Sequence, residues 1–339
     1  MNDKDLLLEV KNLKTHFFLD EGTVRAVDNV TFDITRGQTL GVVGESGCGK
    51  SVTGQSILGI VPPPGRVVEG QVLLHQRPNG NGGEMEQVTD LAALDPRGKE
   101  IRAIRGREIS LIFQEPMTSF SPVHTIGNQI LEGILLHQEV DKKEAAEIAV
   151  EMLQHCGLPR AKEILDQYSW ELSGGMRQRA MIAKSLVCRP NLLIADEPTT
   201  ALDVTMEAQV LDLMRRLQDE MGMAIMYITH DLGVIAEMTE EVIVMYLGKL
   251  VERAGVNTIF YEPKHPYTQA LLRSIPKIGR QRRVRLDTIQ GMVPDPYNIP
   301  PGCAFHNRCT HFMPGVCDAG EPALADTGNG HMVSCFLFK

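Results

Sequence analysis

Long hydrophobic runs are missing from the sequence. No segment approaches the ~18 consecutive apolar residues that a membrane-spanning helix needs. Residues 1–10, MNDKDLLLEV, also lack the basic stretch and following apolar stretch of a secretory signal peptide. We therefore expect a cytoplasmic protein, and any role at a membrane requires a partner.

An excess of positive charge is missing as well. The 339 residues include 34 Lys and Arg against 43 Asp and Glu, which gives a net charge of −9. Because nucleic-acid-binding proteins usually present a basic face, this balance argues against a nucleic-acid partner, although a local patch is not excluded. Internal repeats and low-complexity tracts are also absent. The length suggests about two domains, or one large domain plus an extension.

Short apolar segments alternate with segments of helical pattern. The expected strands are Leu6–Val10, Thr39–Val43, Asn191–Ala195 and Met223–Thr229. The expected helices are Lys50–Ile60, Lys142–Cys156 and Gly175–Val187. Residues 61–65, VPPPG, end the first helix, and residues 78–83, PNGNGG, form a polar turn or loop. The alternation predicts an α/β core with a mostly parallel sheet.

A glycine-rich loop lies between the strand at Thr39–Val43 and the helix that follows. Residues 44–51, GESGCGKS, match the pattern G-x-x-x-x-G-K-[ST], in which backbone N–H groups surround phosphate oxygens. Lys50 is expected to pair with the β- and γ-phosphates and Ser51 to bind Mg²⁺, while the helix dipole favours the same anions. The alternative is a glycine-rich turn that matches by chance. The expected nucleotide contacts are Gly44, Ser46, Gly47, Cys48, Gly49, Lys50, Ser51 and Val52.

A second acidic element follows an apolar strand at residues 192–197, LLIADE. Open α/β sheets bind ligands at the carboxyl ends of their strands, so this strand delivers two carboxylates to such an edge. Asp196 is expected to hold Mg²⁺ through water, and Glu197 to polarise the attacking water. Strand-end acids are often only solvated, but together with the glycine loop the pair predicts a nucleoside triphosphatase.

Residues 172–178, LSGGMRQ, identify the family. They open a helix with a hydroxyl and two glycines, so a phosphate can approach closely; the alternative is a serine that only caps the helix. The glycine loop, this run and the LLIADE strand have the order and spacing of ATP-binding cassette (ABC) ATPases. The chain carries Met176 where that signature usually has Gln. The resemblance implies that Ser173, Gly174 and Gly175 contact an ATP held by another subunit.

Three more segments resemble elements of that family. Within residues 113–116, FQEP, the resemblance implies that Gln114 senses Mg²⁺ and touches a membrane subunit. Within residues 201–203, ALD, Asp203 would cross the dimer interface. His230 would contact the γ-phosphate and hold the attacking water together with Glu197. A plain surface histidine is the alternative for His230.

An aromatic side chain stacks on adenine in the family. The resemblance assigns this role to Phe17, with His16 and Phe18 as rivals and a core aromatic as the alternative. The implied fold is a P-loop NTPase core of ABC type, with a mixed sheet in a RecA-like lobe, a helical subdomain at about residues 115–188 and an antiparallel β subdomain. The nucleotide-binding domain is expected at residues 1–273, and a small cysteine-containing C-terminal extension at residues 274–339.

Four segments resemble one branch, the ATPase subunits of dipeptide/oligopeptide and nickel importers. They are residues 21–30, 114–122, 265–268 and 300–309. The resemblance to ABC ATPases spans about residues 5–275, and residues 300–309 match the C-terminal extension of this branch. The branch implies an importer ATPase at the cytoplasmic face of the inner membrane. Its implied partners are a second ATPase subunit, two transmembrane permease subunits and an extracytoplasmic solute-binding protein. A heterodimer is favoured over a homodimer.

The cargo stays open at this point. Di- or oligopeptides lead, while nickel, opines and oligosaccharides are alternatives. A soluble ABC ATPase acting on DNA or the ribosome is a more remote reading. It is disfavoured because only about 120 residues separate Ser51 from Ser173, without sustained heptads, and because the chain has one phosphate loop.

The C-terminal part contains four clustered cysteines, after a basic run at residues 279–285 and a proline-rich stretch at residues 294–302. The four are Cys303, Cys309, Cys317 and Cys335. Four thiolates suit a 4Fe–4S cluster or a tetrahedral Zn²⁺ site, and the related importer subunits favour iron–sulfur. Metal-free thiols or a disulfide are the alternatives. His306, His311 and His331 could replace a ligand or lie solvated in loops.

Overall fold

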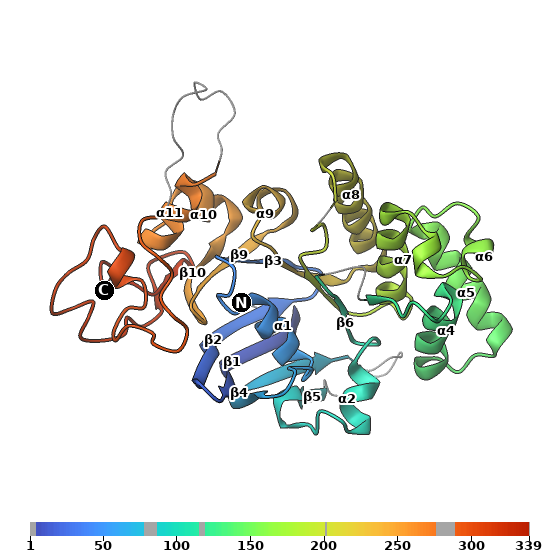
Figure 1. Ribbon diagram of the computed structural model, residues 1–339, viewed down its shortest axis with the longest axis horizontal. Helices are drawn as coiled ribbons and strands as arrows, with labels where there is room; N and C mark the ends of the chain where they lie inside the picture. Colours follow the sequence, from blue (N-terminus) through green and yellow to red (C-terminus); the bar gives the residue numbers. More distant parts are fainter. Residues whose placement is uncertain (1–4, 78–86, 115–118, 201, 276–288, 339) are drawn as a thin grey trace. The chain divides into compact units, whose positions relative to one another are not determined.

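A computed structural model describes residues 5–77, 87–114, 119–200, 202–275 and 289–338 (Figure 1). The chain forms two compact units. The first consists of Leu94–Tyr227 with the short segments Met1–Leu7 and Ile34–Gln38. The second consists of Leu8–Asp33, Thr39–Ala93 and Ile228–Lys339. Each unit is described by itself.

The first unit is built on buried parallel strands. β6 (Ile109–Ile112) pairs in parallel with β7 (Leu192–Asp196), and β8 (Ala224–Ile228) is next to β7 in the strand order. Every residue of β7 and β8 is buried. Continuous apolar strands of this kind are typical of parallel sheets covered on both faces. β7 therefore ends in a fixed position, with Asp196 at its carboxyl end.

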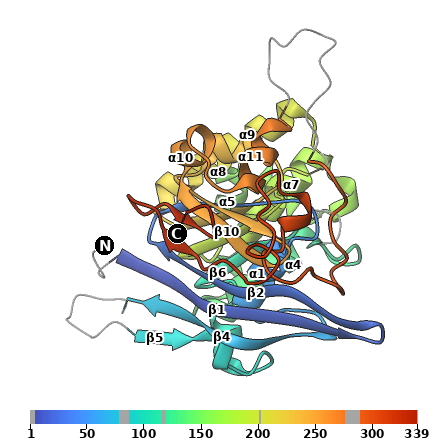
Figure 2. The same ribbon diagram turned by 90° about the vertical axis from the view of Figure 1, so that its left-hand side faces the viewer.

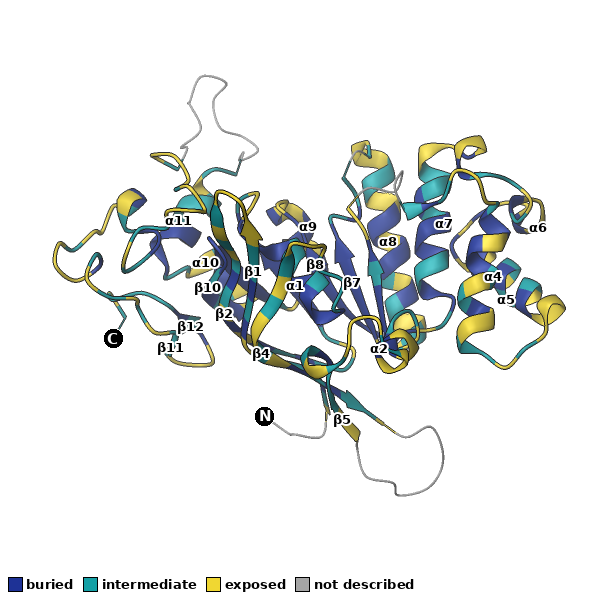
Figure 3. Cartoon of the chain, turned by 60° about the horizontal axis from the view of Figure 1, so that its bottom comes forward, coloured by how far each residue is buried: buried dark blue, intermediate teal, exposed yellow. Residues whose placement is uncertain are grey.

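Helices are the most extensive regular elements of the first unit, and Figure 1 shows α4 to α7 gathered together. Their bounds are α2 (Lys99–Ile104), α4 (Ile126–His137), α5 (Lys142–His155), α6 (Ala161–Ile164), α7 (Gly174–Leu186) and α8 (Val204–Met221), with a 3₁₀ turn at Ser169–Glu171. Side-chain caps begin α4 at Thr125 and α5 at Asp141 by accepting free N–H groups. Figure 3 shows that these helices are buried on one face and exposed on the other, as amphipathic helices are.

The second unit contains an antiparallel sheet with the strand order β2-β1-β4-β5. Figure 2 shows β1, β4 and β5 running side by side. The strands are β1 (Leu6–Leu19), β2 (Gly22–Thr35), β4 (Gly65–Gln76) and β5 (Gln87–Asp90). In this register Phe17 of β1 lies opposite Gly65 of β4. The sheet therefore fixes the position of the aromatic residues near the end of β1.

The other sheet of the second unit has the strand order β11-β12-β10-β9-β3. Its strands are β3 (Thr39–Val43), β9 (Glu241–Tyr246), β10 (Lys249–Gly255), β11 (Ala325–Asp326) and β12 (Met332–Val333). β3 and β9 are parallel, and the other pairs are antiparallel. The α-helices in the described part of this unit are α1 (Lys50–Ile57), α9 (Leu232–Met238), α10 (Val256–Tyr261) and α11 (Pro266–Arg273). C-terminal residues thus complete the sheet that carries the glycine loop.

The helices and strands expected from the sequence are present, with shifted ends. β3 has the expected bounds, whereas β1 runs nine residues further than Val10, to Leu19. α1 ends at Ile57 and not at Ile60, because Gly59 adopts a positive φ of 61° before the proline run begins. The loop at 78–83, the basic run at 279–285, residues 115–116 and Ala201 lie outside the described residues. Among the described helices, none is both long and apolar enough to cross a bilayer.

Candidate nucleotide-binding site

The glycine loop between β3 and α1 depends on positions where a side chain does not fit. Gly44 has a φ of 153°, and a Cβ atom added there would lie 2.2 Å from the Met245 carbonyl oxygen. Gly49 has a φ of 100°, and a Cβ atom added there would lie 2.1 Å from the Ala26 carbonyl oxygen. At Gly47, with φ of 78°, nothing lies within 4 Å of such an atom. Backbone contacts on both sides therefore hold the loop in its curved form.

Lys50 lies across this loop. Its Nζ donates hydrogen bonds to the carbonyl oxygens of Gly44 at 2.9 Å and Glu45 at 3.1 Å, and the residue is only 6% exposed. The N-terminus of α1 has no side-chain cap, so its dipole is available to an anion. Burial raises the pKa of the neighbouring Cys48 thiol, which keeps it neutral. The loop therefore offers the buried cation of Lys50 and the uncapped start of α1 to a phosphate group.

Replacing Gly49 by alanine is expected to unfold the loop. The new methyl group would overlap the Ala26 carbonyl, and the residue would keep a strained positive φ, together costing more than the ~1–3 kcal/mol of a strained backbone alone. Gly47→Ala is the matched control, because it has a positive φ but open space around the added methyl. Thermal unfolding and ATP affinity should both be affected far more by Gly49→Ala. Equal effects of the two variants would contradict this account of the loop.

Glu45 of the loop is bound by residues from the C-terminal part of the same unit. Arg308 donates from Nη1 to Oε2 at 2.7 Å and from Nη2 to Oε1 at 3.0 Å, a bidentate ion pair. The Arg308 side chain is only 4% exposed. The Glu45 N–H donates to the Tyr267 hydroxyl at 2.8 Å. Both the side chain and the backbone of Glu45 are therefore fixed from outside the loop.

An aromatic cluster supports this ion pair. Arg308 also donates to the Tyr246 hydroxyl at 3.3 Å and from Nε to the Gln290 carbonyl at 3.2 Å. The rings of Tyr246, Tyr267 and Phe305 pack against one another with centroids 4.7 to 5.4 Å apart. The hydrogen bond to Glu45 raises the pKa of Arg308, so this guanidinium stays charged. The sequence marked residues 265–268 and 300–309 as branch-specific segments but gave no sign that they reach the loop.

The three aromatic candidates near the end of β1 have different surroundings. The Phe17 ring lies against Gly65, where an added Cβ would be 2.5 Å from Phe17 Cε1. Phe18 is exposed, and the Arg66 guanidinium lies 4.6 Å from its ring centroid. His16 lines a separate cavity described below. The assignment of Phe17 to adenine stays a prediction.

His230 lies in the second unit, exposed, directly after β8. The preceding Thr229 is buried and donates its N–H to the Val42 carbonyl of β3 at 3.2 Å, while the following Asp231 caps α9. The backbone on both sides of His230 is therefore fixed next to β3, the strand that leads into the glycine loop. The His230 side chain is exposed there.

The first unit brings Asp196, Glu197 and Gln114 to one strand edge. Asp196 is 6% exposed at the end of β7. Glu197 Oε2 accepts hydrogen bonds from Gln114 Nε2 and Thr200 Oγ1, both at 2.9 Å. Glu197 has a φ of 46°, which is uncommon for a non-glycine residue. The carboxylate is thus aimed by its backbone and held by two donors.

Ser173 and Asp203 both cap helices in the first unit. Ser173 accepts the Met176 N–H at 3.3 Å at the start of α7, and Asp203 accepts the Met206 N–H at 2.9 Å at the start of α8. Ser173 and Gly174 are exposed, and a Cβ atom at Gly174 would meet nothing within 4 Å. The capping role is therefore present, and the turn is open at the surface. A role for these residues on a nucleotide stays a prediction.

The expected metal centre in the C-terminal part is not formed. No group of three or more His, Cys, Asp or Glu suited to hold a metal ion occurs in the described part of the chain, so the 4Fe–4S prediction is wrong and its Zn²⁺ alternative has no support. The four residues concerned, Cys303, Cys309, Cys317 and Cys335, are free thiols.

The four cysteines lie close enough to influence one another. Burial, and after it the charges of the other three cysteines, raise the pKa of Cys303 to about 11; burial also raises the pKa values of Cys309 and Cys335. Two histidines named as substitute ligands are also engaged elsewhere: His306 with the Cys303 carbonyl and His331 with Glu252. Of the alternatives drawn from the sequence, a disulfide among these cysteines is not formed.

Comparison with known proteins adds two family matches. Residues 27–200 match the model of the ABC transporter family, and residues 251–317 match that of the oligopeptide/dipeptide transporter C-terminal region. The oligopeptide transport ATP-binding protein AppD of Bacillus subtilis is 48% identical over 98% of this chain and 97% of its own length. The dipeptide transport ATP-binding protein DppD of Escherichia coli is 42% identical over 97% and 96%.

Solved structures share the fold. The ATP-binding cassette MJ0796, in a dimeric post-hydrolysis state bound to ADP and Pi, aligns with a TM-score of 0.62 at 24% identity, over 74% of this chain and 99% of that one. CbiO1 of Clostridium perfringens, part of an ABC transporter complex, aligns with a TM-score of 0.60 at 25% identity, over 76% and 92%. These likenesses confirm the expected cassette fold.

Proposed function

The chain belongs to the ATP-binding cassette family of transporter ATPases, in its oligopeptide/dipeptide branch, and from this premise we propose that it is the ATP-hydrolysing subunit of a peptide importer. The observation that carries the proposal is likeness over nearly the whole chain to proteins named for oligopeptide and dipeptide transport. The glycine loop, with Lys50 buried across it, supports ATP·Mg²⁺ as the bound nucleotide.

The proposal assigns roles to residues in both units. In the second unit, Lys50 pairs with phosphate oxygens, Ser51 binds Mg²⁺ and His230 contacts the γ-phosphate. In the first unit, Asp196 holds Mg²⁺ through water and Glu197 polarises the attacking water. The further proposed contacts are Phe17 on adenine, the loop residues 44–52, Gln114 on Mg²⁺, Asp203 at the dimer interface, and Ser173, Gly174 and Gly175 on the partner's nucleotide.

Hydrolysis would be gated by assembly. Two cassettes would enclose two ATP molecules head to tail, each held by the glycine loop of one subunit and the Ser173–Gly175 turn of the other. Closure excludes water and completes the site, which is where stabilisation of the developing charge becomes strong. The exposure of Ser173 and Gly174 supports this role, since an added Cβ atom at Gly174 would meet nothing within 4 Å, whereas the Met206 side chain lies against Gly175.

The proposed assembly follows the branch. We place the chain at the cytoplasmic face of the inner membrane, with a second ATPase subunit, two permease subunits and an extracytoplasmic solute-binding protein. A heterodimer is favoured. We keep residues 1–273 as the nucleotide-binding domain, with a helical subdomain at about 115–188, and residues 274–339 as the extension. Peptides are the proposed cargo, and nickel, opines or oligosaccharides are the outcomes that a cargo screen would distinguish.

Co-purification and uptake test this proposal. Tagged chain extracted from membranes with mild detergent should bring down polytopic subunits. Cells lacking the chain should lose uptake of labelled di- or oligopeptides and regain it with the wild-type gene but not with Lys50→Ala. Recovery of ribosomes or DNA without membrane subunits would contradict the importer. Normal peptide uptake together with lost nickel or oligosaccharide uptake would reassign the cargo.

A further inference from the structure

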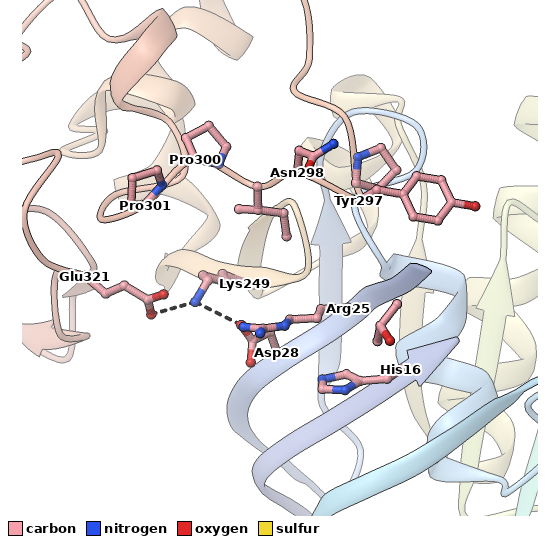
Figure 4. A pocket seen from close by; sticks show the side chains of 12 residues that line it. His16, Arg25, Asp28, Lys249, Tyr297, Asn298, Pro300, Pro301 and Glu321 are labelled. Carbon is pink, nitrogen blue, oxygen red and sulfur yellow. Dashed lines mark hydrogen bonds and ion pairs between the residues drawn. The ribbon is translucent and has the colours of Figure 1, made fainter. Parts of the chain in front are cut away.

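A cavity of about 510 Å³ opens within the second unit, between the β1–β2 hairpin and the C-terminal segment 296–301 (Figure 4). This volume is within the ~300–1,000 Å³ range of sites for small molecules. His16 and Phe18 lie on the same face of β1, whereas the intervening Phe17 ring lies against Gly65. Because successive side chains of a strand point to opposite faces, the cavity is on the face of β1 opposite Phe17. It is therefore separate from the proposed adenine contact.

One positive charge that lines the cavity has no salt-bridge partner among the described residues. Arg25 lines the cavity from β2 and is exposed. Its guanidinium makes no hydrogen bond or ion pair with any part of the chain that the structure describes, and Figure 4 shows none drawn to it. An arginine guanidinium is a rigid, planar donor that suits a carboxylate. The cavity therefore offers an unused binding group for a carboxylate.

A net negative group of three charges also lines the cavity. Lys249 Nζ lies 3.1 Å from Asp28 Oδ2 and 2.6 Å from Glu321 Oε2, as the dashed lines in Figure 4 show. Burial alone would lower the pKa of Lys249, but its hydrogen bonds and charge interactions with Glu321 and Asp28 raise it, so the ammonium stays charged. Two carboxylates against one ammonium leave one negative charge, which can accept an ammonium from a ligand.

Neutral groups complete the lining. Burial lowers the pKa of His16, and its Nε2 has no hydrogen-bond partner among the described residues. On the other wall, Tyr297 lies over Gly22, where an added Cβ would be 3.3 Å from the tyrosine ring, and Pro300 and Pro301 add apolar surface. The cavity thus combines a charge of each sign with an apolar wall.

We propose that this cavity binds a small zwitterion of the amino-acid or short-peptide type, with its carboxylate on Arg25 and its ammonium against Asp28 and Glu321. A simple anion would bind less well than a zwitterion, because it would contact Arg25 but would have no ammonium for Asp28 and Glu321. The tyrosine and proline wall accommodates a small apolar side chain. The inference rests on the lining residues and does not depend on the proposed transport function.

Calorimetric titration of the purified full chain without ATP tests the site directly. The probes are L-alanyl-L-alanine, its N-acetyl derivative, its C-terminal amide and acetate. The dipeptide is expected to bind, and loss of either charge should weaken binding about tenfold or more, as for hydrogen bonds to charged groups. Arg25→Gln should weaken binding of the dipeptide by a similar factor. It should leave the already weak binding of the C-terminal amide unchanged, because the substitution and the amidation remove the same contact.

Arg273→Gln is the matched control, since it removes an exposed arginine on α11 that does not line the cavity. Thermal unfolding of both variants shows whether they fold, and saturating ATP·Mg²⁺ should leave dipeptide binding intact. Four results overturn the proposal: no dipeptide binding up to about 10 mM, acetate binding as tightly as the dipeptide, wild-type dipeptide affinity in Arg25→Gln, or competition by ATP. None of them bears on ATP hydrolysis or transport, so the two proposals fail separately.

Discussion

Replacing Glu197 by glutamine is expected to abolish ATP turnover while ATP binding is retained. The amide keeps the size of the side chain and can still accept a hydrogen bond from Gln114 or Thr200, but it cannot polarise water. Loss of a general base costs about 10²–10⁴-fold in rate. The variant should also accumulate as a closed, ATP-bound dimer. Steady-state phosphate release, nucleotide filter binding and size-exclusion chromatography with ATP measure these three effects.

The control for this variant is Glu220→Gln, an exposed carboxylate on α8. It changes the net charge by the same amount and should retain wild-type turnover. Near-normal phosphate release by Glu197→Gln would remove the assignment of this residue as the base. Loss of turnover together with loss of ATP binding would instead indicate that the β7 edge has been disrupted.

The local parts of the site were predictable from the sequence. The glycine loop, the strand before it and the carboxylates at the end of β7 are each formed by residues that are neighbours in the sequence. Local sequence patterns are therefore enough to predict them. The predicted end of α1 was less accurate. The sequence pattern continues to Ile60, but the positive φ of Gly59 stops the helix before that residue. The two donors to Glu197 were not foreseen, since no periodicity describes a loop contact.

The C-terminal part was the least predictable. The spacing of its cysteines allowed a metal site, but no group of three or more side chains suited to hold a metal ion forms in the part of the chain that the structure describes. The contact from Arg308 to Glu45 joins residues 263 positions apart. A single sequence contains no signal for such a pair, although both lie in segments that the resemblance had marked.

Replacing Arg308 by alanine is expected to weaken ATP binding as well as stability. Removing one partner of this partly buried ion pair is expected to cost about 1–3 kcal/mol, because the other charge is left unpaired. Here the unpaired carboxylate belongs to Glu45, whose backbone carbonyl also accepts from Lys50. The loop should therefore lose its fixed shape, and the ATP KM should rise by about tenfold or more, as for the loss of hydrogen bonds to a charged group. Arg308→Lys should recover part of the affinity through one hydrogen bond.

Arg253 separates a positioning role from a structural one. It is 11% exposed, against 4% for Arg308, and it also binds two acceptors, Glu241 at 2.9 Å and Asp33 at 2.6 Å, but it has no contact with the glycine loop. Arg253→Ala should therefore lower the unfolding temperature as Arg308→Ala does, yet leave the ATP KM unchanged.

A double-mutant cycle with Glu45→Gln then isolates the pair. If Arg308 acts on the loop through Glu45, the effects of Arg308→Gln and Glu45→Gln on ATP affinity should be strongly non-additive, because both remove the same contact. Additive effects, or an unchanged KM in Arg308→Ala, would restrict this residue to fold stability. A non-additive result makes the C-terminal part a component of the nucleotide site, since the residue that fixes Glu45 is contributed from there.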